Sequence, residues 1–201
     1  MSIELLIIPI AFILGGFLTS WILDRNYSSD KIPNYPIVQS LITILLGTIA
    51  ILVSSGTFET SVPLARDGKS ICLIGLLCLV CGMKNALTTW ASYGKIRTTH
   101  LTGLSTDIGL QLPKFFRSEE SKSRYPEPKR VTYVRIITLV SFSFGSCIAG
   151  ALVPIIGYKI FYLTFGISSF LLAVSVIHRQ KLQQAIYIDQ QLIGEPYANT
   201  Q

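Results

Sequence analysis

Long runs of apolar residues without a charge alternate with short polar segments along this chain. Most of the runs hold about 20 residues, and a helix that rises about 1.5 Å per residue then approaches the roughly 30 Å thickness of a bilayer's hydrocarbon core. The pattern predicts an all-α, polytopic membrane protein, a single transmembrane domain over residues 1–201 with five or six transmembrane helices. The predicted spans are 5–23, 35–54, 70–90, 98–113, 131–153 and 158–177.

The number of spans depends on segment 98–113, which is short and half polar. If this segment crosses the membrane, there are six spans and both ends of the chain are cytoplasmic; if it only dips in, there are five and the N-terminus lies outside. The loop 114–130, with six Lys and Arg residues, and the polar tail 178–201 are predicted to be cytoplasmic in both arrangements, because basic loops are retained on that side. We expect a tight turn at Pro154 and Gly157 between the last two spans.

Composition supports a membrane protein and narrows what it can do. Half of the 201 residues are hydrophobic and 14% are charged, whereas an ordinary soluble domain has about 25% charged residues. This excludes a soluble enzyme, a disordered chain and a disulfide scaffold. Six of the basic residues behind the net charge of +6 lie in the loop 114–130, so the charge reports topology and we predict no nucleic-acid partner. The four cysteines lie in apolar segments, where cysteine acts as a small hydrophobe, and we predict no metal and no cofactor.

Two of the predicted helices carry a similar short pattern. Phe12-x-x-Gly15 in the first span matches Phe142-x-x-Gly145 in the fifth, and small residues follow each of them. This echo indicates two related three-helix halves, of which the first is incomplete. Such repeats are common in transporters.

Segment 82–112 is the part of the chain that composition does not explain. Around a helix that begins at Thr98, four apolar residues form one stripe: Leu101, Leu104, Ile108 and Leu112. Hydroxyl groups, an imidazole and a carboxylate lie on the opposite side. Since ionisable side chains inside a bilayer cost roughly 3 kcal/mol or more unless they are paired or hydrated, this polar side should face other helices or water.

The polar side predicts the lining of a cavity at membrane depth. The candidate lining residues are Asn85, Arg97, Thr98, Thr99, His100, Thr102, Thr106 and Asp107. A helix N-terminus at Thr98, next to Arg97, would suit an anion. The alternative interpretation is that the threonines and the asparagine only hold helices together.

The same residues resemble the YoaK family of small bacterial multi-pass membrane proteins, a family of unknown function. The resemblance lies in Gly82-Met-Lys-Asn-Ala-Leu-Thr-Thr89, in Arg97-Thr-Thr-His-Leu-Thr-Gly103 followed by Thr106-Asp-Ile-Gly109, and in Ser141-Phe-x-x-Gly145 with Gly150. It implies a place in the cell membrane, specifically the bacterial inner membrane, and a preceding helix with a first motif copy that this chain lacks. Lys84 and Trp90 depart from the family, which more often has Gln and a basic residue there.

Three functions follow as hypotheses. We favour a small-solute or ion permease, or a half-transporter that works as a homodimer in the lipid bilayer, because a discontinuous polar segment accompanies two similar halves. The alternative is a structural or interaction protein of the membrane with no transport activity. An intramembrane enzyme that uses His100 and Asp107 as acid and base is disfavoured, since they lie about 10 Å apart along a helix and no nucleophile or metal set accompanies them. We therefore expect no enzyme activity.

Overall fold

Helices form nearly all of the chain that the structure describes, and this part contains no strand. The structure, a computed structural model, describes residues 6–25, 33–56, 68–92, 101–115 and 129–194. Its elements are α1 (Ile7–Arg25), α2 (Tyr35–Ser54), α3 (Gly68–Ala91), α4 (Leu101–Gln111), the 3-10 helix η2 (Leu112–Phe115), α5 (Lys129–Ile156), the 3-10 helix η3 (Gly157–Lys159) and α6 (Ile160–Gly194). The predicted all-α class is confirmed.

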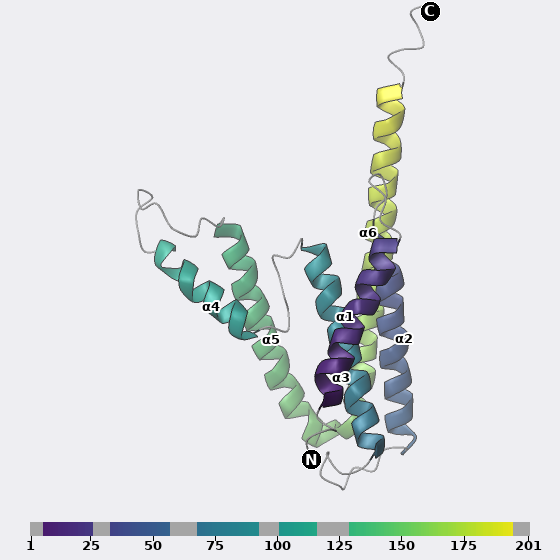
Figure 1. Ribbon diagram of the computed structural model, residues 1–201, viewed down its shortest axis with the longest axis vertical. Helices are drawn as coiled ribbons and strands as arrows, with labels where there is room; N and C mark the ends of the chain where they lie inside the picture. Colours follow the sequence, from purple (N-terminus) through teal and green to yellow (C-terminus); the bar gives the residue numbers. More distant parts are fainter. Residues whose placement is uncertain (1–5, 26–32, 57–67, 93–100, 116–128, 195–201) are drawn as a thin grey trace, which may run out of the picture.

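Four helical stretches in the described residues are long and apolar enough to cross a membrane by length and composition. They are Ile7–Arg25, Tyr35–Ser54, Gly68–Ala91 and Arg130–Gln184. The last stretch contains both α5 and the apolar part of α6, which run in opposite directions (Figure 1). The protein is therefore a polytopic helical membrane protein, as its hydropathy pattern predicts.

Helices α1, α2, α3 and α6 form the body of the molecule, and α4 and α5 stand beside it (Figure 1). Helix α1 runs parallel to α3, because Ile7 faces Gly75 and, further along both helices, Thr19 Oγ1 donates to the carbonyl oxygen of Met83 at 3.4 Å. Helix α2 runs antiparallel to α3 and α6. The apolar core lies where α1, α2 and α3 meet and consists of Leu23, Val38, Ile42, Ile49, Val53, Val80 and Met83.

The contact between α1 and α3 is made by small residues. The buried residues of α1 recur at every fourth position: Ala11, Gly15, Thr19 and Leu23. A Cβ atom at Gly15 would overlap the carbonyl oxygen of Leu79, and a Cβ atom at Gly82 would overlap that of Phe12. The two backbones therefore touch directly, as in the small-xxx-small interfaces of membrane helices.

Helix α4 is too short to cross a membrane by itself. Its 11 residues extend about 16 Å, roughly half of the hydrocarbon core. Helix α3 ends and α5 begins at the same end of the molecule (Figure 1). The chain therefore leaves α3 and enters α5 on the same side. Of the two arrangements expected for segment 98–113, this geometry is compatible with the one with five crossings; residues 98–100 lie outside the described residues. Residues 116–128 of the predicted basic loop lie outside the described residues.

The end of α5 and the course of α6 differ from the sequence prediction. Pro154 lies inside α5 rather than in a turn, because a proline removes a single backbone hydrogen bond and this helix ends two residues later. The turn begins at Gly157, whose φ of 56° suits a residue without a Cβ atom. Helix α6 continues for 35 residues to Gly194, about 52 Å, so the described part of the polar tail 178–201 is a helical extension of the last span.

Candidate functional site

The predicted cavity residues do not form one group in the structure. Four of them lie outside the described residues: Arg97, Thr98, Thr99 and His100. Asn85 is buried on α3, Thr102 and Thr106 are exposed on α4, and Asp107 pairs with a residue of α5. Helix α4 packs on α5 rather than on α3. Asn85 and Asp107 therefore belong to two separate polar sites.

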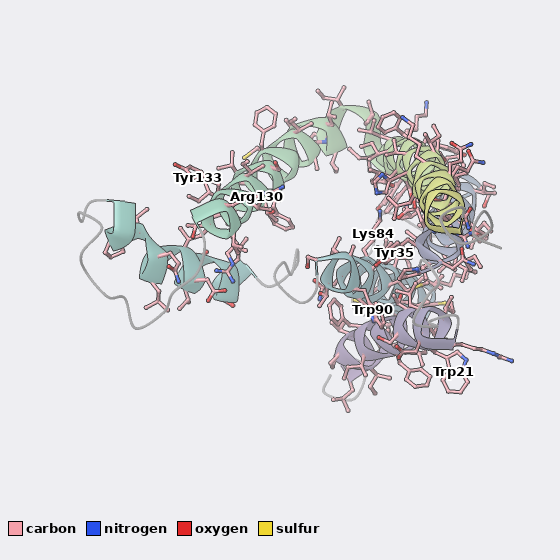
Figure 2. All side chains as sticks on the ribbon, turned by 90° about the horizontal axis from the view of Figure 1, so that it is seen from above. Trp21, Tyr35, Lys84, Trp90, Arg130 and Tyr133 are labelled. Atoms are coloured by element: carbon pink, nitrogen blue, oxygen red, sulfur yellow. The ribbon has the colours of Figure 1, made fainter. Side chains whose placement is uncertain are left out.

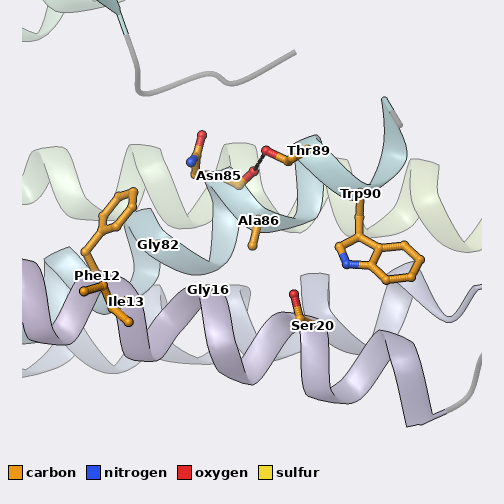
Figure 3. A pocket seen from close by; sticks show the side chains of 9 residues that line it. All are labelled: Phe12, Ile13, Gly16, Ser20, Gly82, Asn85, Ala86, Thr89 and Trp90. Carbon is orange, nitrogen blue, oxygen red and sulfur yellow. Dashed lines mark hydrogen bonds between the residues drawn. The ribbon is translucent and has the colours of Figure 1, made fainter. Parts of the chain in front are cut away.

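Asn85 lines an open groove of about 410 Å³ between α1 and α3. Figure 3 shows Phe12 and Trp90 toward its two ends, with Ser20 on the α1 side. The Thr89 hydroxyl donates to the backbone carbonyl oxygen of Asn85 at 2.7 Å. The full lining is Phe12, Ile13, Gly16, Ser20, Gly82, Asn85, Ala86, Thr89 and Trp90. This volume falls within the range of small-molecule sites, about 300–1,000 Å³, and the walls offer aromatic rings together with amide and hydroxyl groups.

A network of polar contacts joins α2, α3 and α6 inside the bundle. Lys84 Nζ donates to Gln39 Oε1 at 3.2 Å. The amide nitrogen of Gln39 donates to both the carbonyl oxygen and the hydroxyl of Ser168, at 3.1 and 3.0 Å. The hydroxyls of Thr43 and Ser168 lie 2.8 Å apart. Gln39, Thr43 and Ser168 are only 4%, 6% and 2% exposed. Three neutral polar side chains therefore hydrogen-bond to one another in the interior, and the amide oxygen of Gln39 faces Lys84.

The network and the groove lie on different sides of α3. Lys84 lies on the side that faces α2, where it contacts Gln39, whereas Trp90 lies toward α1 (Figure 2). Lys84 and Asn85 are neighbours in sequence and therefore point about 100° apart around the helix. Lys84 lies seven residues before the end of α3, about 10 Å along the axis, in a helix that is long and apolar enough to span a membrane.

The sequence prediction missed the four residues of this network. Lys84 stood out only as a departure from the YoaK pattern, and Gln39, Thr43 and Ser168 are isolated polar residues in apolar segments. The one local signal is the four-residue spacing of Gln39 and Thr43, which places both on the same side of α2. Ser168 lies more than 120 residues further along the chain, so no local pattern could have paired it with them.

The second polar site joins α4 to α5 through an ion pair. Arg135 Nη2 lies 3.2 Å from Asp107 Oδ2, and the side chains of Arg135 and Asp107 are 9% and 48% exposed. Leu104 and Gln111 are also buried, so α4 meets α5 with the side that bears Leu104, Asp107 and Gln111. The predicted separation of an apolar stripe from the carboxylate is therefore wrong, because positions i, i+3 and i+7 lie on one side of a helix. Sequence reasoning also missed Arg135, a single charge inside a predicted span.

These features define the class of protein: a polytopic helical membrane protein whose spanning helices enclose polar side chains. The family follows from comparison with known proteins. The model of a family described as "Protein of unknown function (DUF1275)" matches residues 2–177, and the chain belongs to this family. No curated protein and no solved structure matches it. The YoaK resemblance and a missing first helix stay predictions.

Proposed function

We propose that this protein is a permease for small polar solutes in the bacterial inner membrane, working as a single chain or as a half-transporter in a homodimer. The observation that carries the proposal is the contact of Lys84 with Gln39 and, through it, with Ser168. An ionisable side chain inside a membrane bundle is costly, and such residues mark substrate or ion paths by default. A lysine with no such role would extend its ammonium group to the membrane surface, whereas this one is held by an interior amide.

The groove beside α3 supports the same function. It adds Asn85, Thr89 and Ser20 to the polar groups beside α3. Two polar features on different sides of one helix, about 100° apart around its axis, suit a protein in which α3 is the central element of a path. We propose that the groove binds solute and that the Lys84 network lines the path beside it.

The test is uptake by the purified protein in liposomes, measured with small neutral, anionic and cationic solutes. We expect uptake of at least one solute above the rate of protein-free liposomes, and a loss of at least fivefold in Gln39→Leu, because leucine fills the space without holding Lys84. Ser40→Ala is the matched control: Ser40 neighbours Gln39 on α2, but its hydroxyl only donates within its own helix, to the carbonyl oxygen of Ile37 at 2.8 Å. Uptake equal to that of empty liposomes for every solute would contradict the proposal.

A structural role without transport is the alternative, and the backbone contact between α1 and α3 favours it, since small residues are the usual means of helix association in membranes. This role predicts no flux of any solute. It also predicts that Thr102→Ala and Asp107→Asn lower stability or assembly. Because Thr102 is exposed on α4, its substitution separates an assembly defect from a folding defect.

A further inference from the structure

We infer that Lys84 makes the path selective for small monovalent anions. The inference rests on the proposed function and names its class of substrate. The spanning parts of the four-helix body are residues 7–23, 35–54, 70–91 and 160–177. Within them, Lys84 is the single charged residue. A protonated Lys84 therefore gives this body one positive charge without a carboxylate among those spanning residues.

No carboxylate in the described part of the chain neutralises this charge. The acceptor that Lys84 contacts is the neutral amide oxygen of Gln39. Asp107, the carboxylate within a predicted span, pairs instead with Arg135 beside the four-helix body. Attraction between unit charges is many times stronger in a medium of low dielectric constant than in water, so the bundle interior favours a mobile anion and disfavours a cation.

The hydrogen-bonding capacity of the network points in the same direction. An ammonium group has three donors, and Gln39 accepts one of them. The amide nitrogen of Gln39 is directed at Ser168, which orients its oxygen toward Lys84 and keeps the lysine in place. Among the described residues no other acceptor is bonded to the Lys84 ammonium, which leaves two donors for a ligand. A halide, nitrate or short carboxylate can accept them and also neutralise the charge. Rings of Lys and Arg select anions in other pores on the same principle.

The experiment compares the wild type with two substitutions of Lys84 in the full chain. Lys84→Gln removes the charge but can still bond to Gln39, and Lys84→Arg keeps the charge; both are checked by size-exclusion chromatography and circular dichroism. In liposomes we expect nitrate and chloride flux to fall at least tenfold in Lys84→Gln and to stay within about threefold of wild type in Lys84→Arg. Lys69→Gln, which removes an exposed charge from the first turn of the same helix, serves as the control and should not change the flux.

A binding measurement keeps this inference separate from the proposed function. The thermal unfolding of the detergent-purified protein is followed with and without nitrate, because a ligand that binds the folded state raises its stability. A nitrate-dependent rise in Tm that Lys84→Gln abolishes, without flux, supports the anion site and contradicts the permease. Flux of neutral solutes that is equal in wild type and Lys84→Gln, or a nitrate response that is equal in both, overturns the inference while leaving transport in place. Absence of both flux and a nitrate response overturns the two together.

Discussion

Helices α1 and α5 carry the same spacing of small residues, but only the small residues of α1 are covered. On α1 every member of the row Ala11, Gly15, Thr19 and Leu23 is buried, and α3 meets it backbone to backbone. The corresponding row of α5, aligned on the shared Phe-x-x-Gly pattern, is Ser141, Gly145, Ala149 and Val153. None of these four residues is buried, and nothing lies within 4 Å of a Cβ atom at Gly145.

The difference shows that a small-residue row permits close helix packing without requiring it. A row of small residues gives a helix a surface that another backbone can approach, but the partner helix must also have a small residue at the contact. Helix α3 brings Gly82, which faces the carbonyl oxygen of Phe12. Helix α5 instead meets α4 through the ion pair of Arg135 and Asp107. The molecule thus has a closely packed body and a loosely attached pair, held by different kinds of contact.

The comparison makes its largest prediction for glycine substitutions. Gly15→Ala and Gly82→Ala should each lower the free energy of unfolding by about 2–3 kcal/mol, because the new methyl group would overlap a carbonyl oxygen of the facing backbone. Gly145→Ala is the matched control and should not lower it, because its methyl group meets no neighbour and alanine favours a helix over glycine by up to about 1 kcal/mol. Equilibrium unfolding in mixed detergent micelles, followed by circular dichroism, measures all three. Equal losses at Gly15 and Gly145 would show that the row of α5 is covered as well.

An intermediate loss in the free energy of unfolding is expected where polar contacts, rather than small residues, hold the body together. Ser168→Ala removes the hydroxyl that bonds to both Gln39 and Thr43, while the backbone carbonyl still accepts from Gln39. We expect a loss of about 1 kcal/mol, typical of hydrogen bonds between membrane helices, in the same unfolding assay. Ser169→Ala is the control, since that hydroxyl donates only to Phe165 of its own helix. If Ser169→Ala costs as much as Ser168→Ala, the network contributes little to joining α2 and α6.

The smallest global effect is expected in the loosely attached pair. Asp107→Asn should lower the free energy of unfolding by less than about 1 kcal/mol, because nearly half of the Asp107 side chain is exposed and the ion pair is partly screened. The change should instead be local: hydrogen exchange should become faster in α4 and stay the same in α3. Thr106→Ala, which removes only a bond to the carbonyl oxygen of Thr102 in the same helix, should change neither. Faster exchange in α3 would show that the two parts are coupled.

Much of the architecture could be predicted from the sequence because the hydrophobic pattern is a local property. An uncharged run of suitable length has few alternatives to a spanning helix in a bilayer, so the spans at 35–54 and 70–90 were placed within two residues of α2 and α3. The short segment 98–113 left two arrangements open. The direction of α5 relative to α3 favours five spans, and that direction depends on how the helices assemble.

The candidate site was predicted less well, because its residues are brought together across long distances in the chain. Asn85 is predicted to line a polar cavity, and the structure places it in a groove with α1. The partners of Lys84 and Asp107 are Gln39 and Arg135, and nothing near Gln39 or Arg135 in the sequence identifies them as partners.

The amino-acid sequence alone is enough to establish a membrane protein of several helices, because each helix satisfies its own backbone and its length must match the bilayer. Which sides of those helices meet is a different matter, since lipid solvates apolar side chains as well as a neighbouring helix does and hydrophobicity cannot choose between them. Shape complementarity and hydrogen bonds between distant segments decide which sides of the helices meet. The covered row of α1, the open row of α5 and the contact that holds Lys84 therefore exist only once the helices are assembled.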